Sequence, residues 1–67
     1  MRLLRMIHHW HNAKLRHIDI QILWPEIKKQ TSNIDEARNA FELHALDDPA
    51  WQDMSEAEIY RVIENLT

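Results

Sequence analysis

Apolar residues in the second half of the chain recur at steps of three and four, the spacing that places side chains on one face of an α-helix. The polar run 31–33 precedes the first of these segments. Within it, Asn33 is followed three residues later by Glu36, which is the pattern of a helix-capping box. We therefore predict a helix over residues 33–46.

A second capping pattern stands near the end of the sequence. Ser55 with Glu58 three residues later precedes another apolar stripe and predicts a helix over residues 55–66. Between the two helices, Asp48 and Pro49 fit the cap and the first position of a short helical turn, since proline's fixed φ and missing N–H cost nothing there. The two helices should therefore pack as a pair joined by a short connector.

The first half of the chain has one long helical pattern with a proline near its end. Pro25 removes the hydrogen bond to residue 21 and disfavours a helical backbone at Trp24. We expect a kink rather than a loop, with the helix continuing to about Gln30. The prediction is a single all-α domain over residues 1–67, a small three-helix fold in which a long kinked helix over residues 1–30 is packed by the C-terminal helix pair.

The long helix carries two apolar seams when it is drawn with regular α-helical geometry. The first seam consists of Leu4, Leu15, Ile18 and Ile22. The second, on the opposite side, consists of Met6, Trp10, Ala13, Ile20 and Trp24. Two short helices with one narrow apolar face each can cover one seam but hardly both, unless they wrap the kinked helix more fully than its pattern indicates.

We interpret the second seam as a contact surface for another protein or another copy of the chain, because large exposed apolar patches are unusual on a finished monomer. The residues expected at this interface are Met6, Trp10, Ile20 and Trp24 as anchors, with Arg5 and Arg16 at the rim. The sequence does not separate self-association from capture of a different protein.

A polar stripe between the seams offers an alternative function. Its members follow one another at steps of three and four: Arg2, Arg5, His9, Asn12 and Arg16. Such a face could bind phosphates and base edges of a nucleic acid. Charge is unevenly spread, because residues 1–30 hold six Lys and Arg against two acids, whereas residues 31–67 hold two against nine, for a net charge of −3. Either the two halves attract each other within the fold or between copies, or the basic half meets a phosphate or an acidic protein surface. A nucleic-acid-binding domain is usually basic overall.

Composition excludes several classes of site. The chain has no glycine and no cysteine, so the glycine-rich loops that cradle nucleotide phosphates are excluded, and so are disulfides and thiolate-metal sites. No apolar run approaches the ~20 residues that a membrane span requires. Residues 1–18 lack acids as an organellar presequence does, but they also lack serine, and removing them would leave too little chain to fold.

The histidines do not form a metal site on one helix. His8 and His11 alone have the spacing of a ligand pair, and no acid lies within a turn of them. His44 could meet His11 in the fold, but a hydrogen-bonded histidine in the core is the favoured interpretation. We expect no metal and no cofactor.

Catalysis has equally little support, because the serines are explained as turn or cap residues and no nucleophile stands beside a base. The expected function is that of a non-enzymatic interaction protein, either an oligomeric structural or accessory component or a binder or inhibitor of another protein. Short chains of this character are typical of the accessory proteins that phages encode. The expected location is cytoplasmic, that is, intracellular, with the interior of a virion as the alternative.

Overall fold

The computed structural model describes the backbone of residues 2–67 and the side chains of residues 10–67. Along the chain the elements are α1 (Arg2–Ile18), the π-helical segment η1 (Asp19–Leu23), α2 (Trp24–Gln30), α3 (Ile34–Asp47), the 3-10 turn η2 (Pro49–Trp51) and α4 (Glu56–Glu64). In this described part the secondary structure is helical, with no strand. The predicted all-α class and its three helices are confirmed.

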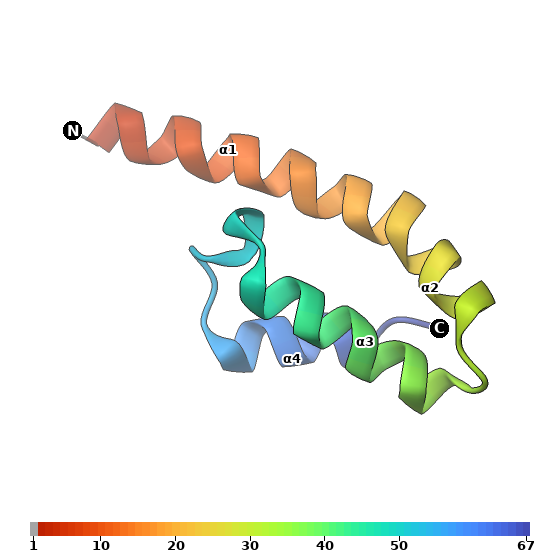
Figure 1. The fold of residues 1–67 in the computed structure, drawn as a ribbon. Helices are drawn as coiled ribbons and strands as arrows, with labels where there is room; N and C mark the ends of the chain where they lie inside the picture. Colours follow the sequence, from red (N-terminus) through yellow and green to blue (C-terminus); the bar gives the residue numbers. More distant parts are fainter. Residues whose placement is uncertain (1) are drawn as a thin grey trace.

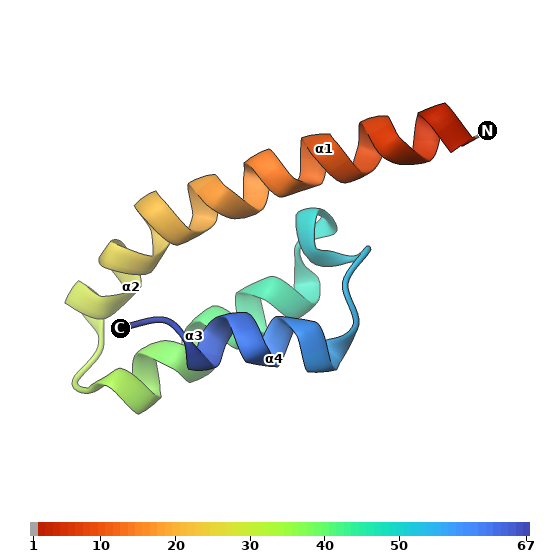
Figure 2. The same cartoon turned by 180° about the vertical axis from the view of Figure 1, so that it is seen from behind.

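The three N-terminal elements form one long, gently bent rod, and α3 and α4 lie side by side along one flank of it (Figure 1). The view from behind shows the same arrangement, with the N-terminal end of α1 projecting past the α3–α4 pair and the C-terminus lying next to α2 (Figure 2). The long helix packed by a C-terminal pair is therefore confirmed as well.

The helix ends follow the capping signals in the sequence. Asn33 caps α3, its side-chain oxygen accepting a hydrogen bond from the Glu36 N–H at 2.9 Å. Ser55 and Glu58 form a complete capping box at the start of α4, and Asp48 caps η2. The end of α4 differs from the prediction, because the helix stops at Glu64 instead of residue 66.

The long helix passes through Pro25 without a loop, and η1 explains how. The Trp24 N–H bonds to the carbonyl of Asp19, five residues earlier, so the turn before the proline is one residue wider than an α-helical turn. This wider turn rotates everything after it by about 100°, the angle of one residue in an α-helix. A regular helix would place Trp10 and Trp24 about 40° apart, whereas the π turn moves them to nearly opposite sides.

The core shows the result of that rotation. It consists of Trp24, Ala37, Phe41, Ala45, Ala50, Trp51, Ile59, Ile63 and Leu66, with Ile20, Leu23, Ile27, Met54 and Val62 packed against it. Phe41 lies at the centre, edge-on to Trp24 at 5.8 Å and to Trp51 at 5.7 Å between ring centroids. Such T-shaped pairs add to the stabilisation that burial alone supplies. The three aromatic rings therefore join the rod, α3 and η2, and Ile59 and Ile63 bring α4 into the same core.

The division into a covered and an open seam is wrong, both on α1 and beyond it. Trp24, predicted on the open seam, is only 4% exposed. Ile22, predicted on the covered seam, is 64% exposed, and Leu15 and Ile18 are also exposed. The wider turn of η1 explains Trp24, because the helical wheel assumed a constant 100° per residue. Leu15 and Ile18 precede that turn, and they are exposed because the side of α1 that packs against η2 carries Arg16 and Asn12 instead.

Hydrogen bonds connect Thr67 to α2. The Trp24 Nε1–H donates to the main-chain oxygen of Thr67 at 3.2 Å, and the Lys28 ammonium donates to the same oxygen at 2.8 Å. Arg38 on α3 donates to the Leu66 carbonyl. These contacts satisfy the indole N–H of a buried tryptophan and hold Leu66 in the core.

The capping box of α4 predicts a pH dependence. Hydrogen bonds from the Ser55 backbone and hydroxyl lower the pKa of Glu58 below its ordinary value of 4.5. The folded state thus favours the charged carboxylate. Glu58 therefore contributes fully to the free energy of unfolding above its unfolded-state pKa, and this contribution is lost as the pH falls through its folded-state pKa. We expect the stability advantage of the wild type over Glu58→Gln to be largest near neutral pH and to vanish on acidification. Urea unfolding at a series of pH values measures it, and a pH-independent difference would contradict the assignment.

Candidate interaction surface

An exposed apolar area lies on the side of α1 that faces away from α3 and α4. Its lining residues follow one another at steps of three, one, three and one, which places them on one side of the helix: Trp10, Ala13, Lys14, His17 and Ile18. We call these residues the α1 outer patch. Trp10 is its largest member, and 65% of its surface is exposed.

The charge on the α1 outer patch is positive. Lys14 brings a permanent positive charge, and residues 10–18 contain no acid. The patch is therefore an apolar surface with a cationic edge, suited to a partner surface that is apolar and acidic.

A second exposed apolar area lies at the end of α3. The pocket at this end is lined by Leu43, His44, Asp47, Asp48 and Pro49. We call Leu43, Asp47 and Pro49, with the exposed Leu46, the α3 acidic patch. Leu43 is 71% exposed and Leu46 is exposed beside it, while Asp47 supplies a carboxylate at the same end of the helix. The two patches thus have opposite charge and similar apolar character.

The structure brings only part of the predicted interface to the surface. Trp10 lies on the α1 outer patch. Trp24, expected as a second anchor, lies in the core instead, and Ile20 is partly buried against that core. The side chains of Met6 and Arg5 lie outside the described residues.

Arg16, expected at the rim of the interface, packs against η2. Its Nη1 donates to the Ala50 carbonyl and to the Asp53 carboxylate, both at 2.7 Å. The guanidinium also lies 6.0 Å from the centre of the Trp51 ring, within reach of a cation–π interaction. With only 12% of its side chain exposed, Arg16 is part of the fold.

The packing of Arg16 against η2 also affects the predicted nucleic-acid face, of which Arg16 is a member. Within its described residues, Arg16 is engaged with η2 and Asn12 is partly buried. The side chains of Arg2, Arg5 and His9 lie outside the described residues. The described part of the stripe therefore offers no outward-facing arginine for a phosphate.

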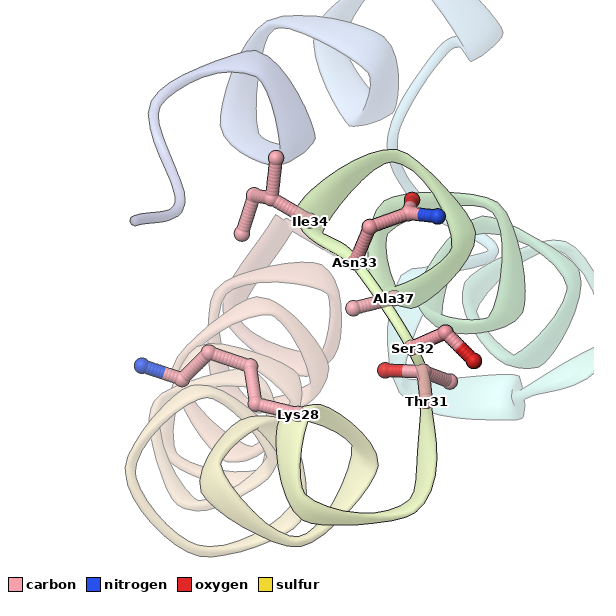
Figure 3. Close-up of a pocket in the computed structure, with 6 residues that line it drawn as sticks. All are labelled: Lys28, Thr31, Ser32, Asn33, Ile34 and Ala37. Carbon is pink, nitrogen blue, oxygen red and sulfur yellow. The ribbon is translucent and has the colours of Figure 1, made fainter.

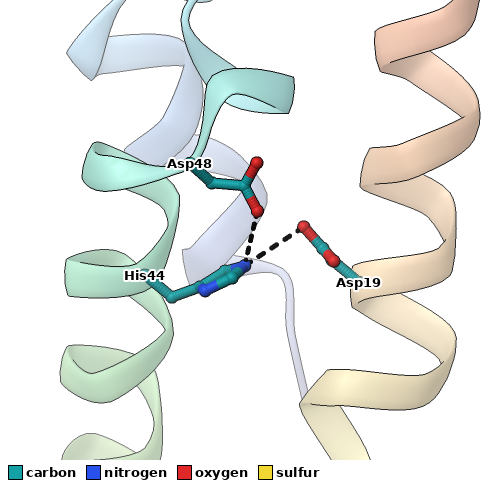
Figure 4. Close-up of side chains that lie close together, drawn as sticks. All are labelled: Asp19, His44 and Asp48. Atoms are coloured by element: carbon teal, nitrogen blue, oxygen red, sulfur yellow. Dashed lines mark hydrogen bonds and ion pairs between the residues drawn. The ribbon is translucent and has the colours of Figure 1, made fainter.

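A cluster that the sequence did not reveal joins the rod to α3. His44 Nε2 lies 2.8 Å from Asp48 Oδ2 and 3.3 Å from Asp19 Oδ2, and all three side chains point toward one another (Figure 4). The Trp51 indole N–H also donates to Asp19 Oδ2 at 2.9 Å. The prediction that His44 is hydrogen-bonded is confirmed, but its side chain is 36% exposed and lies outside the core, and His11 is exposed. The four-residue step from His44 to Asp48 was visible in the sequence, but the third member comes from a distant segment.

Polar groups that line a pocket at the turn between α2 and α3 already contact neighbouring parts of the chain. Figure 3 shows the residues that line it: Lys28, Thr31, Ser32, Asn33, Ile34 and Ala37. The Thr31 hydroxyl donates to the Ile27 carbonyl, and Asn33 caps α3. Lys28 reaches the Thr67 oxygen and the Trp24 ring. These groups stabilise the turn.

Among the described residues, no helix combines the length and the apolar character that crossing a membrane requires. Comparison of the chain with protein-family models, with curated proteins and with solved structures gives no match. What this protein does must therefore be argued from its own surfaces.

Proposed function

We propose that this chain is a non-enzymatic protein that acts through protein–protein contacts, with the α1 outer patch as its contact surface. The exposure of Trp10 beside Ala13 and Ile18 carries the proposal. The side chain of a solvent-exposed tryptophan has a large apolar surface, and burying that surface against a partner is favourable. Tryptophan is also among the residues that dominate the binding energy of protein interfaces.

The occupant we propose is a second copy of the chain, contacting through its α3 acidic patch. Leu43 and Leu46 supply the apolar area that Trp10 and Ile18 require. Asp47 supplies the charge opposite to that of Lys14. Pairing two α1 outer patches with each other would instead bring like charges together, which is unfavourable. Charge complementarity therefore favours contact between unlike patches, an arrangement that closes into a ring or extends into a chain of copies.

Self-association is tested by light scattering across a range of protein concentrations. We expect the wild type to rise above the monomer mass with concentration, and Trp10→Ala and Leu43→Ala each to weaken association by at least about tenfold. Both side chains are largely exposed, so neither change should disturb the core. Tyr60→Ala on α4 is the matched control, because Tyr60 is exposed but belongs to neither patch.

A charge exchange identifies which surfaces meet. Lys14→Glu alone is expected to weaken association by several-fold, because it places an acid against Asp47, and the double change Lys14→Glu with Asp47→Lys should restore it. Wild-type protein that stays monomeric at every concentration would overturn self-association. A monomer whose affinity for duplex DNA falls steeply with salt would favour the nucleic-acid alternative instead.

A further inference from the structure

The geometry points to a divalent transition-metal site formed by Asp19, His44 and Asp48, with Zn²⁺ as the ion best suited to it. The three residues bring one imidazole nitrogen and two carboxylate oxygens within 4.8 Å of one another. Imidazole and carboxylate are both ligands of zinc. This inference does not depend on the proposed function.

The site is inferred from two carboxylate oxygens that lie close to the same nitrogen atom, Nε2 of His44. His44 Nε2 holds at most one hydrogen, yet two carboxylate oxygens from different segments lie 2.8 Å and 3.3 Å from it. One hydrogen shared between Asp19 and Asp48 leaves each with a weakened bond, and the two negative charges repel. A cation that accepts the nitrogen lone pair and both oxygens satisfies all three groups at once.

The spacing of the donor atoms suits zinc. Zinc bonds to nitrogen and oxygen of about 2.0–2.1 Å in a tetrahedron place neighbouring ligand atoms about 3.3 Å apart. The separation of 3.3 Å matches that value, the one of 2.8 Å is shorter, and all three donor atoms lie within 4.8 Å of one another, so small side-chain shifts would bring them to that spacing. Three protein ligands leave one tetrahedral position for water, and Figure 4 shows the three side chains converging on one point from the rod and from α3.

Groups around the cluster orient the ligands. Asp48 accepts the Ala50 N–H through Oδ1 and turns Oδ2 toward His44. Trp51 donates to Oδ2 of Asp19, the oxygen that also faces His44, and so occupies one of its two lone pairs and leaves the other for an ion. Such supporting hydrogen bonds are a regular feature of metal sites. Asp19 is also the first residue of η1, and π-helical turns occur often at functional sites.

A bound ion would link the rod to α3, which makes stability the first readout. Isothermal titration of the full chain with zinc chloride should show one equivalent bound. At a free zinc concentration about a hundredfold above Kd, we expect Tm to rise by about 10–20 °C. Magnesium chloride is the control ion, because Mg²⁺ prefers sites built from oxygen ligands alone. An unchanged Tm in excess zinc overturns the site.

Conservative variants separate this site from the N-terminal histidines. Asp19→Asn retains an acceptor for Trp51 and Asp48→Asn retains a helix cap, so both should fold, and each should lower zinc affinity by at least about tenfold. His8, His9 and His11 changed together to glutamine form the control and should leave affinity unchanged. The opposite pattern, with zinc lost in that triple variant and kept in Asp19→Asn and Asp48→Asn, overturns the proposal. In the wild type, zinc should shift the ring ¹⁵N signals of His44 more than those of His17, and the reverse order overturns it too.

Discussion

Phe41→Ala is expected to unfold most of the protein at room temperature. Phe41 is fully buried, and its ring contacts Trp24 and Trp51 in two edge-on pairs. Replacing a buried phenylalanine by alanine costs about 3–5 kcal/mol, because the lost transfer free energy is joined by the cost of the cavity. In a domain of this length a single core rarely supplies more than about 3–5 kcal/mol, so the loss is comparable to the whole stability.

Circular dichroism and urea unfolding measure that loss, and the same helix supplies the control. Leu43→Ala removes an apolar side chain two residues away that is 71% exposed, so it should change the free energy of unfolding by less than about 0.5 kcal/mol. If both variants lose a similar amount of stability, Phe41 is not at the centre of the core.

Arg16→Ala is expected to lower the free energy of unfolding by about 2–3 kcal/mol. The guanidinium holds η2 against α1 through the Ala50 carbonyl, the Asp53 carboxylate and the Trp51 ring. Because the side chain is 12% exposed, the pair with Asp53 is screened less than a surface salt bridge. Removing the arginine also leaves the Ala50 carbonyl without its side-chain donor.

The Arg16 variant decides between a role in the fold and a role at a partner surface. Thermal unfolding of Arg16→Ala is compared with that of Lys14→Ala, which removes an exposed cation two residues away on the same helix. A drop in Tm for the first variant alone is the expected result. If Arg16→Ala kept the wild-type Tm but lost affinity for a partner or for DNA, the intramolecular role assigned here would be wrong.

Much of the fold follows from local sequence. Asn33 and Ser55 mark the starts of α3 and α4 within one residue, because a cap needs only a side-chain oxygen and the N–H groups of the next turn. Asp48 and Pro49 mark η2 in the same way. Local sequence also predicts the helical class, the number of helices and the passage of the first helix through Pro25.

The exposed surfaces were harder to predict from the sequence than the helices were. Trp10 was correctly placed on the surface, but Trp24 was not, since a helical wheel cannot show that the turn before Pro25 is a π turn. Arg16 looked like a free cation because Asp53, its partner, lies 37 residues away in the sequence. The pattern of a single helix contains no information about such a distant neighbour.

The sequence alone determined the local elements of this protein: which segments are helical, where two of them begin, and that the chain lacks glycine and cysteine for nucleotide loops and thiolate sites. Tertiary structure decided which face of the long helix is covered and which residues meet. The cluster of Asp19, His44 and Asp48 exists only because the rod packs along α3. Capping and periodicity depend on neighbours within a few residues, whereas burial and ligand geometry depend on contacts between segments far apart in the chain.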